Sequence, residues 1–298
     1  TMHDLGFLYS LYSVVIYKLT GDRRQRALGL KAANVFADRF IPEGGYLRAW
    51  GRMDETDTDH TGIAIIDCMM NLPLLFWASE ETGDPRYRDI AIRHSNTTLE
   101  RFVRDDDSVF HAYRFDPATG APLHGDNYCG HSAESHWSRG TAWAIYGFAM
   151  SHRYTGDRRY MDAALRLSLK FISLLDEEIV PIWDFRAPLN CRAHDRDSSA
   201  AAIAACGFQE IEAAGCADEL IVHWKNALID RLCSDDYFDS NPAVRGALKH
   251  GSANPDRSCY TSWGDYFLME ALARENGARI VTDLPDGEAL ERLPTRMH

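Results

Sequence analysis

Basic residues are scarce in this chain relative to acidic ones, and long uninterrupted apolar runs are absent. The 298 residues include 32 Lys and Arg against 44 Asp and Glu, a formal net charge of −12, which excludes a general basic surface for nucleic-acid phosphates. The longest apolar run covers residues 62–78, and Asp67, Asn71 and Pro73 make it too short and too polar to cross a bilayer. We therefore predict no nucleic-acid partner and no membrane partner.

Cysteines are few and irregularly spaced. The seven of them, an odd number, show neither C-x-x-C nor C-x-x-H spacing, which fits neither a disulfide framework nor a zinc site. We predict buried thiols in a reducing compartment, hence a cytoplasmic protein, and no metal. Residues 1–4 show no charged and then apolar leader, but an earlier removal of a signal leaves export open as the alternative.

One carboxylate, Asp67, stands inside the apolar run at 62–78, which we expect to be a helix. Burying an unpaired carboxylate costs at least several kcal/mol, which is comparable with the whole stability of a domain. A buried acid has a raised pKa, as a general acid requires near neutral pH, so the position predicts a catalytic acid. The structural alternative is an Asp that hydrogen-bonds to a neighbouring helix.

A repeat organises the chain. Three similar segments begin with Thr-Gly-Asp, at Thr20, Thr82 and Thr155. In each segment the Gly is suited to end one helix in a left-handed conformation, and the Asp is suited to cap the next helix. Such a turn folds two helices back on each other, so its repetition predicts stacked α-hairpins.

The helix before each of these turns is more apolar than the helix after it, which predicts an inner and an outer ring. We expect nine helices. The inner ones are expected near 4–19, 62–80, 137–154, 198–214 and 263–275, and the outer ones near 21–40, 84–103, 157–176 and 218–233. The connections at 41–61, 104–136, 177–197 and 234–262 are unusually long, which predicts binding loops.

Polar and aromatic residues concentrate where these loops enter the inner helices. The motifs are HDLGF at 3–7, RAWG at 48–51, IIDCMMNLPLLFWASEETGD at 65–84, FHAYRFDPATG at 110–120, WSRGTAWAIYGFA at 137–149, WDF at 183–185, RDSSAAAIAACG at 196–207 and YTSWGDYFLMEAL at 260–272. Together, from His3 to Arg274, they resemble the unsaturated glucuronyl hydrolases, glycoside hydrolase family 88. The resemblance implies an all-α fold, the (α/α)6 barrel of six-hairpin glycosidases, which needs twelve helices.

Since nine helices are visible, the resemblance also implies that an N-terminal part of the barrel is missing from this chain or is supplied otherwise. We therefore expect an incomplete barrel domain at 1–276 and a polar tail at 277–298.

Members of this family hydrate a vinyl ether. The resemblance implies a substrate oligosaccharide that a polysaccharide lyase has left with a 4,5-unsaturated uronic acid at its non-reducing end. Asp67 would protonate C4 and then help water to attack C5, Asp4 would be the second catalytic carboxylate, and the hemiketal product would open to release the aglycone. When two carboxylates share an apolar site, the pKa of one of them rises, which leaves a proton available at neutral pH. The reaction then requires no metal, and we expect no cofactor. For Asp4 the structural alternative is an N-cap.

The same matching of motifs implies a set of substrate-binding residues. His111 and Arg139 would lie near the uronate carboxylate and the reacting ring, and three tryptophans would line the pocket, because aromatic faces stack on sugar C–H surfaces. Each Trp could instead belong to the core, and Arg139 could pair structurally. The full set is His3, Trp50, His111, Cys129, Trp137, Arg139 and Trp143.

The loop NYCGHSAESHW at 127–137 departs from the family pattern. Relatives commonly carry Gln at the position of Cys129 and Asp at the position of Ala133. A substrate hydrogen bond or a loop-fixing carboxylate is therefore expected to be missing. The possible substitutes are His131, Glu134 and His136.

Three other functions stay open at this point. Unsaturated rhamnogalacturonyl hydrolases, family 105, share the fold and chemistry but accept another aglycone, and the uninterrupted motif at 65–84 favours family 88. An N-acylglucosamine 2-epimerase is also an (α/α)6 barrel but uses histidine bases. An inactive sugar-binding barrel is the third possibility. The aglycone and the oligomeric state are left open.

Overall fold

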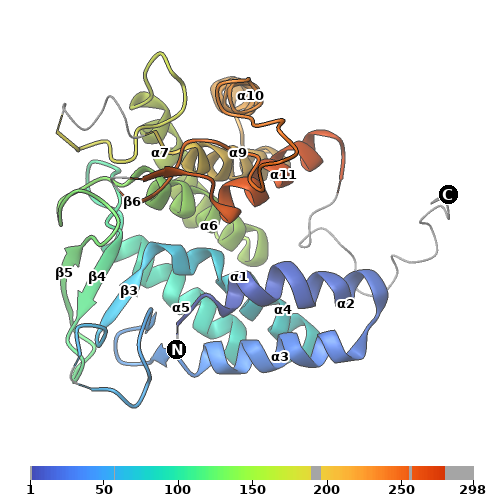
Figure 1. Cartoon of the computed structure of the whole chain (residues 1–298). Helices are drawn as coiled ribbons and strands as arrows, with labels where there is room; N and C mark the ends of the chain where they lie inside the picture. The colour runs from blue at the N-terminus through green and yellow to red at the C-terminus, as the bar shows by residue number, and fades with distance from the viewer. Residues whose placement is uncertain (1, 57, 189–195, 255–256, 279–298) are drawn as a thin grey trace.

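Helices make up most of the computed structural model, which describes residues 2–56, 58–188, 196–254 and 257–278. The first four inner helices are each followed by an antiparallel outer helix, and small β-hairpins gather at one end of these pairs (Figure 1). The all-α architecture expected from the sequence is confirmed. No helix in the described ranges has the length and apolar character that a membrane span requires.

The inner helices lie close to the expected positions. The first runs without a break from α1 (Leu5–Tyr9) through a π-helical turn, η1 (Ser10–Val14), into α2 (Val15–Thr20). The other inner helices are α4 (Leu72–Thr82), α6 (Ser138–Thr155), α9 (Ser198–Ala213) and α11 (Ser262–Glu275). The outer helices are α3 (Arg23–Ala37), α5 (Pro85–Arg101), α7 (Arg158–Ser173) and α10 (Glu219–Leu232). Each inner helix packs against the next in chain order.

The three Thr-Gly-Asp turns have the predicted geometry. Gly21, Gly83 and Gly156 have φ angles of 70°, 74° and 73°, a left-handed conformation that glycine adopts without steric cost. The Asp after each glycine accepts a hydrogen bond from a backbone N–H in the first turn of the next helix. The turns therefore end one helix and start the next, and they hold each hairpin antiparallel.

Short antiparallel strands that the sequence did not predict lie in the long loops, and one more lies at 63–65, where a helix was expected. Three of them form a sheet in the order β3–β4–β5, and the other four form two hairpins. Their bounds are β1 (Phe40–Ile41), β2 (Tyr46–Leu47), β3 (Ile63–Ile65), β4 (Ala112–Phe115), β5 (Pro122–Asp126), β6 (Gly251–Asn254) and β7 (Arg257–Cys259).

The prediction of one helix at 62–80 is partly wrong. Ile63, Ala64 and Ile65 form the wholly buried strand β3, and Ile65 pairs with Ala112 of β4. The chain then passes through a 3₁₀ turn, η2 (Ile66–Met70), before α4 begins. A short buried strand and a buried helix have the same apolar composition, so periodicity could not separate them.

A close contact between η2 and α6 fixes this turn in the core. A Cβ atom added to Gly147 of α6 would lie only 2.4 Å from Cβ of Met69, so a glycine is needed there. Ile66, Cys68 and Met69 are completely buried, which leaves Asp67 as the residue of the turn that faces away from the apolar core.

The expectation of uniformly buried cysteines is wrong. The described cysteines are free thiols; Cys68 and Cys206 are buried, Cys129, Cys216 and Cys259 are partly exposed, and Cys233 is exposed. Cys191 lies outside the described residues, and so do residues 279–298 of the predicted tail. The domain boundary at 276 therefore stays a prediction.

Candidate active site

Asp67 sits on η2 at the end of the barrel where the inner helices begin. Its side chain is 20% exposed, so a substrate can reach it, whereas the sequence analysis placed it inside an apolar helix. Its Oδ2 atom is buried and has no hydrogen-bond partner in the described part of the chain. The Nε2 atom of His111 lies 3.6 Å from that oxygen, which is longer than a hydrogen bond. A negative charge on Oδ2 is therefore poorly stabilised.

The pKa of Asp67 reflects this environment. Burial raises the pKa of Asp67 to about 7, and the charge of Asp4 raises it as well, while Arg139 and Trp143 act in the opposite direction. A carboxyl group with a pKa of about 7 is roughly half protonated at neutral pH. Such a group can donate a proton and then act as a base. The expected rise in pKa from burial and a like charge is confirmed.

Asp4 precedes α1 but does not cap it. Its side chain makes no hydrogen bond to the N–H groups of the first turn, so the N-cap alternative is wrong, and it is 30% exposed. Burial raises the pKa of Asp4, whereas the Asn71 amide and the Arg39 guanidinium lower it. His3 Nε2 lies 3.3 Å from Asp4 Oδ1. Because burial lowers the pKa of His3 to about 3, its ring is neutral at physiological pH.

Asn71 joins the two carboxylate-bearing elements. Its Oδ1 atom accepts the backbone N–H of Phe7 in α1 at 2.8 Å, and its Nδ2 atom lies 3.4 Å from the carbonyl oxygen of Asp67. The side chain is completely buried. The sequence analysis missed Asn71 as a site residue, although its position four residues after Asp67 in an apolar run was a usable signal.

His111 stands just before β4 and faces Asp67. Its Nδ1 atom accepts the backbone N–H of Tyr128 at 3.0 Å, so the proton of the neutral ring must be on Nε2. Burial lowers the pKa of His111 to about 3, and the charge of Arg139 lowers it further. The ring therefore presents an N–H group toward the Asp67 carboxyl and does not compete with it for the proton.

The three predicted tryptophans surround this pair but are unequally accessible. Trp50 is partly exposed, with its ring centroid 6.4 Å from that of His111. Trp137, which is 2% exposed, meets His111 edge-on at 4.9 Å. Trp143, 4% exposed, packs 5.2 Å from Phe7 of α1. Trp137 and Trp143 are therefore core residues as well as neighbours of the site, and Trp50 offers the more open ring.

Arg139 is held by a buried ion pair. Its Nη1 atom donates to Asp197 Oδ2 at 2.6 Å, to Ser199 Oγ at 3.1 Å and to the Ser252 carbonyl oxygen at 2.6 Å. Its guanidinium also lies 4.6 Å from the ring centroid of Trp137. The structural pairing that the sequence left open is therefore present. Asp197, completely buried, was not named as a site residue, although it begins an inner helix as Asp4 does.

Cys129 lies beside the carboxylate site as an uncharged thiol. Burial raises the pKa of Cys129 to about 12, and the nearby charge of Asp67 also raises it. The substitutes considered for the missing loop carboxylate stay predictions, and Glu134 Oε2 pairs with Arg104 Nη1 at 3.4 Å. His131 and Glu134 are exposed, and the ring of His136 packs on Phe185 at 5.2 Å. The carboxylate that contacts this loop comes from Asp184, in another segment.

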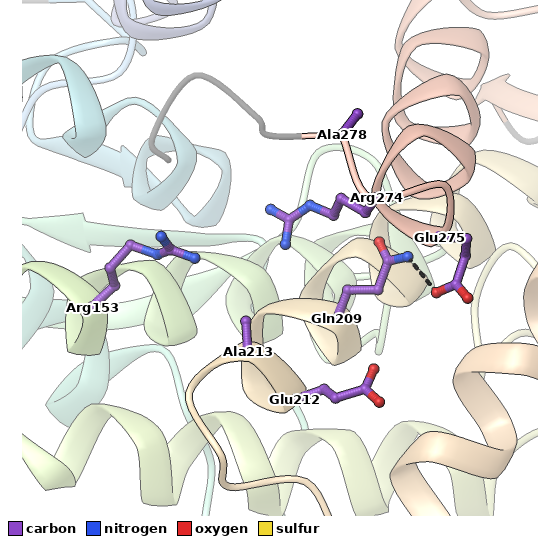
Figure 2. Close-up of a pocket in the computed structure, with 7 residues that line it drawn as sticks. All are labelled: Arg153, Gln209, Glu212, Ala213, Arg274, Glu275 and Ala278. Carbon is purple, nitrogen blue, oxygen red and sulfur yellow. Dashed lines mark hydrogen bonds between the residues drawn. The ribbon is translucent and has the colours of Figure 1, made fainter. Parts of the chain in front are cut away.

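A hollow of about 540 Å³ lies at the opposite end of the inner helices (Figure 2). It is lined by Arg153, Gln209, Glu212, Ala213, Arg274, Glu275 and Ala278. These residues belong to the final turns of α6, α9 and α11 or follow them, whereas Asp4, Asp67 and Arg139 lie where inner helices begin. The hollow is therefore separate from the carboxylate site. In the described ranges no three His, Cys, Asp or Glu side chains are grouped as metal ligands.

A helical barrel with two coupled, solvent-accessible carboxylates defines a class of glycoside hydrolase, and known proteins agree. The model of Glycosyl Hydrolase Family 88 matches residues 3–215. The unsaturated glucuronyl hydrolase of Bacillus sp. (strain GL1) is 39% identical over 284 residues, which cover 91% of this chain and 74% of that protein. The chain belongs to glycosyl hydrolase family 88, and it is a glycoside hydrolase of the unsaturated glucuronyl hydrolase type.

Solved structures show the same likeness. The crystal structure of the Bacillus sp. GL1 unsaturated glucuronyl hydrolase has a TM-score of 0.86 at 38% identity, with 92% of this chain and 74% of that chain covered. A variant of the Streptococcus agalactiae enzyme complexed with dGlcA-GalNAc6S has a TM-score of 0.75 at 31% identity, with 94% of this chain and 70% of that chain covered. The (α/α)6 barrel class expected from the sequence is confirmed.

Proposed function

We propose that this chain removes the 4,5-unsaturated uronic acid from the non-reducing end of oligosaccharides, with Asp67 as the general acid and base. The observation that supports this assignment is the reachable Asp67 carboxyl, whose pKa is raised to about 7 by burial and by Asp4. At neutral pH it can give its proton to C4 of the C4=C5 vinyl ether. The positive charge that develops is shared by C5 and the ring oxygen.

The ionised Asp67 then accepts a proton from a water molecule as that water bonds to C5. The product is a hemiketal at C5, whose ring opens and releases the aglycone sugar. The negative charge of Asp4 opposes ionisation of Asp67 and favours the positive charge that develops on the sugar. The Nε2–H of His111 faces Asp67 and steadies the carboxylate formed when the proton leaves.

Recognition of the uronate carboxylate is assigned to Arg139 and His111, and Trp50 is assigned to the sugar face. The hydrogen bonds described for Arg139 are made through Nη1, and its pairing with Asp197 fixes the guanidinium beside Trp137. Such fixed polar groups beside an aromatic wall are the usual composition of a small-ligand pocket. Because the Streptococcus agalactiae relative holds dGlcA-GalNAc6S, chondroitin-type disaccharides are the first substrates to test.

The family match favours this function over the epimerase and the inactive barrel. An epimerase that uses histidine bases is disfavoured further, because burial lowers the pKa of both His3 and His111 to about 3 and makes them weak bases. The test is the loss of ultraviolet absorbance of an unsaturated disaccharide as the C4=C5 double bond is hydrated. Turnover by the wild type and a fall in kcat of roughly 10²-fold or more in Asp67→Asn supports the assignment, and equal turnover by both would contradict it.

A further inference from the structure

The loop at 127–137 is organised around one buried carboxylate from another segment. Asp184 is completely buried. Its Oδ2 atom accepts the backbone N–H of His131 at 2.8 Å, and its Oδ1 atom accepts the backbone N–H groups of His136 at 3.1 Å and of Arg186 at 2.9 Å. Hydrogen bonds to an ionised carboxylate are stronger than those to a neutral acceptor. Two of the three reach the loop, so Asp184 ties it to the chain around position 184.

The same segment holds both pocket residues of the loop. Trp183, next to Asp184, donates its indole N–H to the Cys129 carbonyl oxygen at 2.8 Å. Trp137 forms an antiparallel bridge with Asp184, and the Ser138 backbone N–H donates to the Trp183 carbonyl oxygen at 3.0 Å. Residues 183 and 184 therefore hold the backbone at Cys129 and Trp137 from outside the loop, and within the loop the Cys129 N–H also donates to Asn127 Oδ1 at 3.0 Å.

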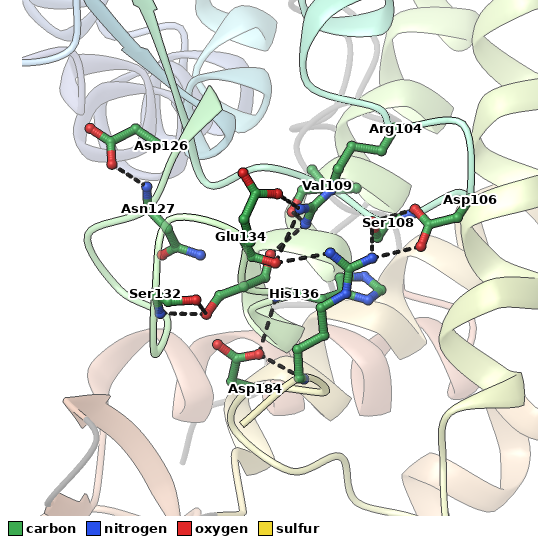
Figure 3. A network of polar contacts seen from close by, with 12 residues as sticks. Arg104, Asp106, Ser108, Val109, Asp126, Asn127, Ser132, Glu134, His136 and Asp184 are labelled. Carbon is green, nitrogen blue, oxygen red and sulfur yellow. Dashed lines mark hydrogen bonds and ion pairs between the residues drawn. The ribbon is translucent and has the colours of Figure 1, made fainter. Parts of the chain in front are cut away.

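Two arginines from outside the loop also hydrogen-bond to its backbone. Arg104 donates to the Ser135 carbonyl oxygen, and Arg186 donates to that of Glu134 at 2.9 Å. Figure 3 shows the Arg104 guanidinium beside Glu134, and Asp184 close to the segment that carries Ser132 and His136. These contacts from outside the loop restrain it.

We propose that Asp184 is a positioning residue for the reaction, because it holds the loop that places Cys129 and Trp137 beside Asp67. The proposal rests on the proposed function for its kinetic part, and its structural part can be measured separately. Asp184 does not touch the reacting sugar. It acts by keeping the pocket wall at a fixed distance from the Asp67–His111 pair.

The test uses the whole chain with the variant Asp184→Asn, which keeps the shape of the side chain but turns an NH2 group toward backbone N–H donors. KM for an unsaturated disaccharide should rise and kcat/KM should fall about 10- to 100-fold, as loss of one charged hydrogen bond predicts. The pKa seen in the pH dependence of kcat should stay near that of the wild type, because Asp67 and Asp4 are untouched.

A second readout follows the loop itself. Modification of Cys129 by an organomercurial, followed by peptide mass spectrometry, should be at least about threefold faster in Asp184→Asn, because local opening exposes the thiol. Asp162→Asn on α7 is the control, since Asp162 is 58% exposed and its ion pair with Arg158 lies outside this network. It should leave KM and the modification rate of Cys129 unchanged.

If Asp184→Asn does not fold, Trp183→Phe replaces it, because it removes the hydrogen bond to Cys129 and keeps an aromatic ring at this position. A smaller increase in the Cys129 modification rate is then expected. A folded Asp184→Asn variant with wild-type KM and wild-type modification of Cys129 would overturn the proposal. If the wild-type chain does not lower the ultraviolet absorbance of the disaccharide, the proposed function is contradicted instead. The modification rates of Cys129 then still decide the role of Asp184.

Discussion

Oδ2 of Asp67 lies 3.6 Å from Nε2 of His111, and that nitrogen carries the proton of a neutral ring. The tautomer follows from the backbone N–H of Tyr128, which occupies Nδ1. At this distance the imidazole N–H makes no hydrogen bond to Oδ2, and a small approach would let it donate one to the ionised carboxylate. His111 is therefore placed to stabilise Asp67 when its carboxyl group loses the proton during the reaction.

Replacing Asp67 by Asn keeps the size of the side chain and removes the transferable proton. We expect kcat to fall by roughly 10²- to 10⁴-fold while the disaccharide still binds. Loss of absorbance at the double bond measures turnover, and calorimetry measures binding. Asp162→Asn on α7, at a 58% exposed position, is the control and should retain wild-type kcat. Substantial turnover by Asp67→Asn would exclude this residue as the acid.

Replacing Asp4 by Asn should move the pH dependence of kcat. The active form of Asp67 is protonated, so activity is lost as the pH rises through its pKa of about 7. Removal of the Asp4 charge lowers that pKa, because the like charge no longer opposes ionisation. The alkaline limb should therefore shift to lower pH, and kcat at pH 7 should fall. An alkaline limb at its original position would show that the two carboxylates do not interact.

Asp67 should make the folded chain less stable as the pH rises. Its pKa is about 7 in the folded chain against the ordinary value of 3.8, so the unfolded chain releases this proton first. The free energy of unfolding should fall by about 2–3 kcal/mol between pH 5 and pH 8 on account of this group. Urea unfolding of the wild type and Asp67→Asn at both pH values measures it. The variant should be the more stable one at pH 8, and equal pH dependence would contradict the raised pKa.

Arg139 combines two roles that a double variant can separate. Arg139→Ala should raise KM and also destabilise the chain by about 3–5 kcal/mol, because the buried Asp197 loses its counter-charge. The double variant of Arg139→Ala with Asp197→Ala should recover part of the stability but not the KM. Arg24→Ala at the exposed start of α3 is the control and should change neither quantity. Recovery of KM in the double variant would show that Arg139 acts only structurally.

Local sequence alone predicted the helical hairpins and the end of the barrel that carries the site. The Thr-Gly-Asp turns specify their own geometry, because glycine adopts the left-handed conformation and Asp caps a helix without help from distant residues. Polar residues concentrated at the starts of the inner helices indicated that end, and the resemblance to family 88 implied Asp4, Asp67 and Arg139 as site residues.

The tertiary structure decided the strand pairing, the pKa values and the hydrogen-bond partners of those residues. Whether residues 63–65 form a strand depends on pairing with 112–114, which no local pattern reveals. Asp67 has a pKa of about 7 because of burial and of Asp4, which is 63 positions away in the chain. Asp197 pairs with Arg139, and Asp184 restrains the loop at 127–137, across similar separations. Electrostatic and hydrogen-bond energies depend on distances in space, so only the folded chain could assign these partners.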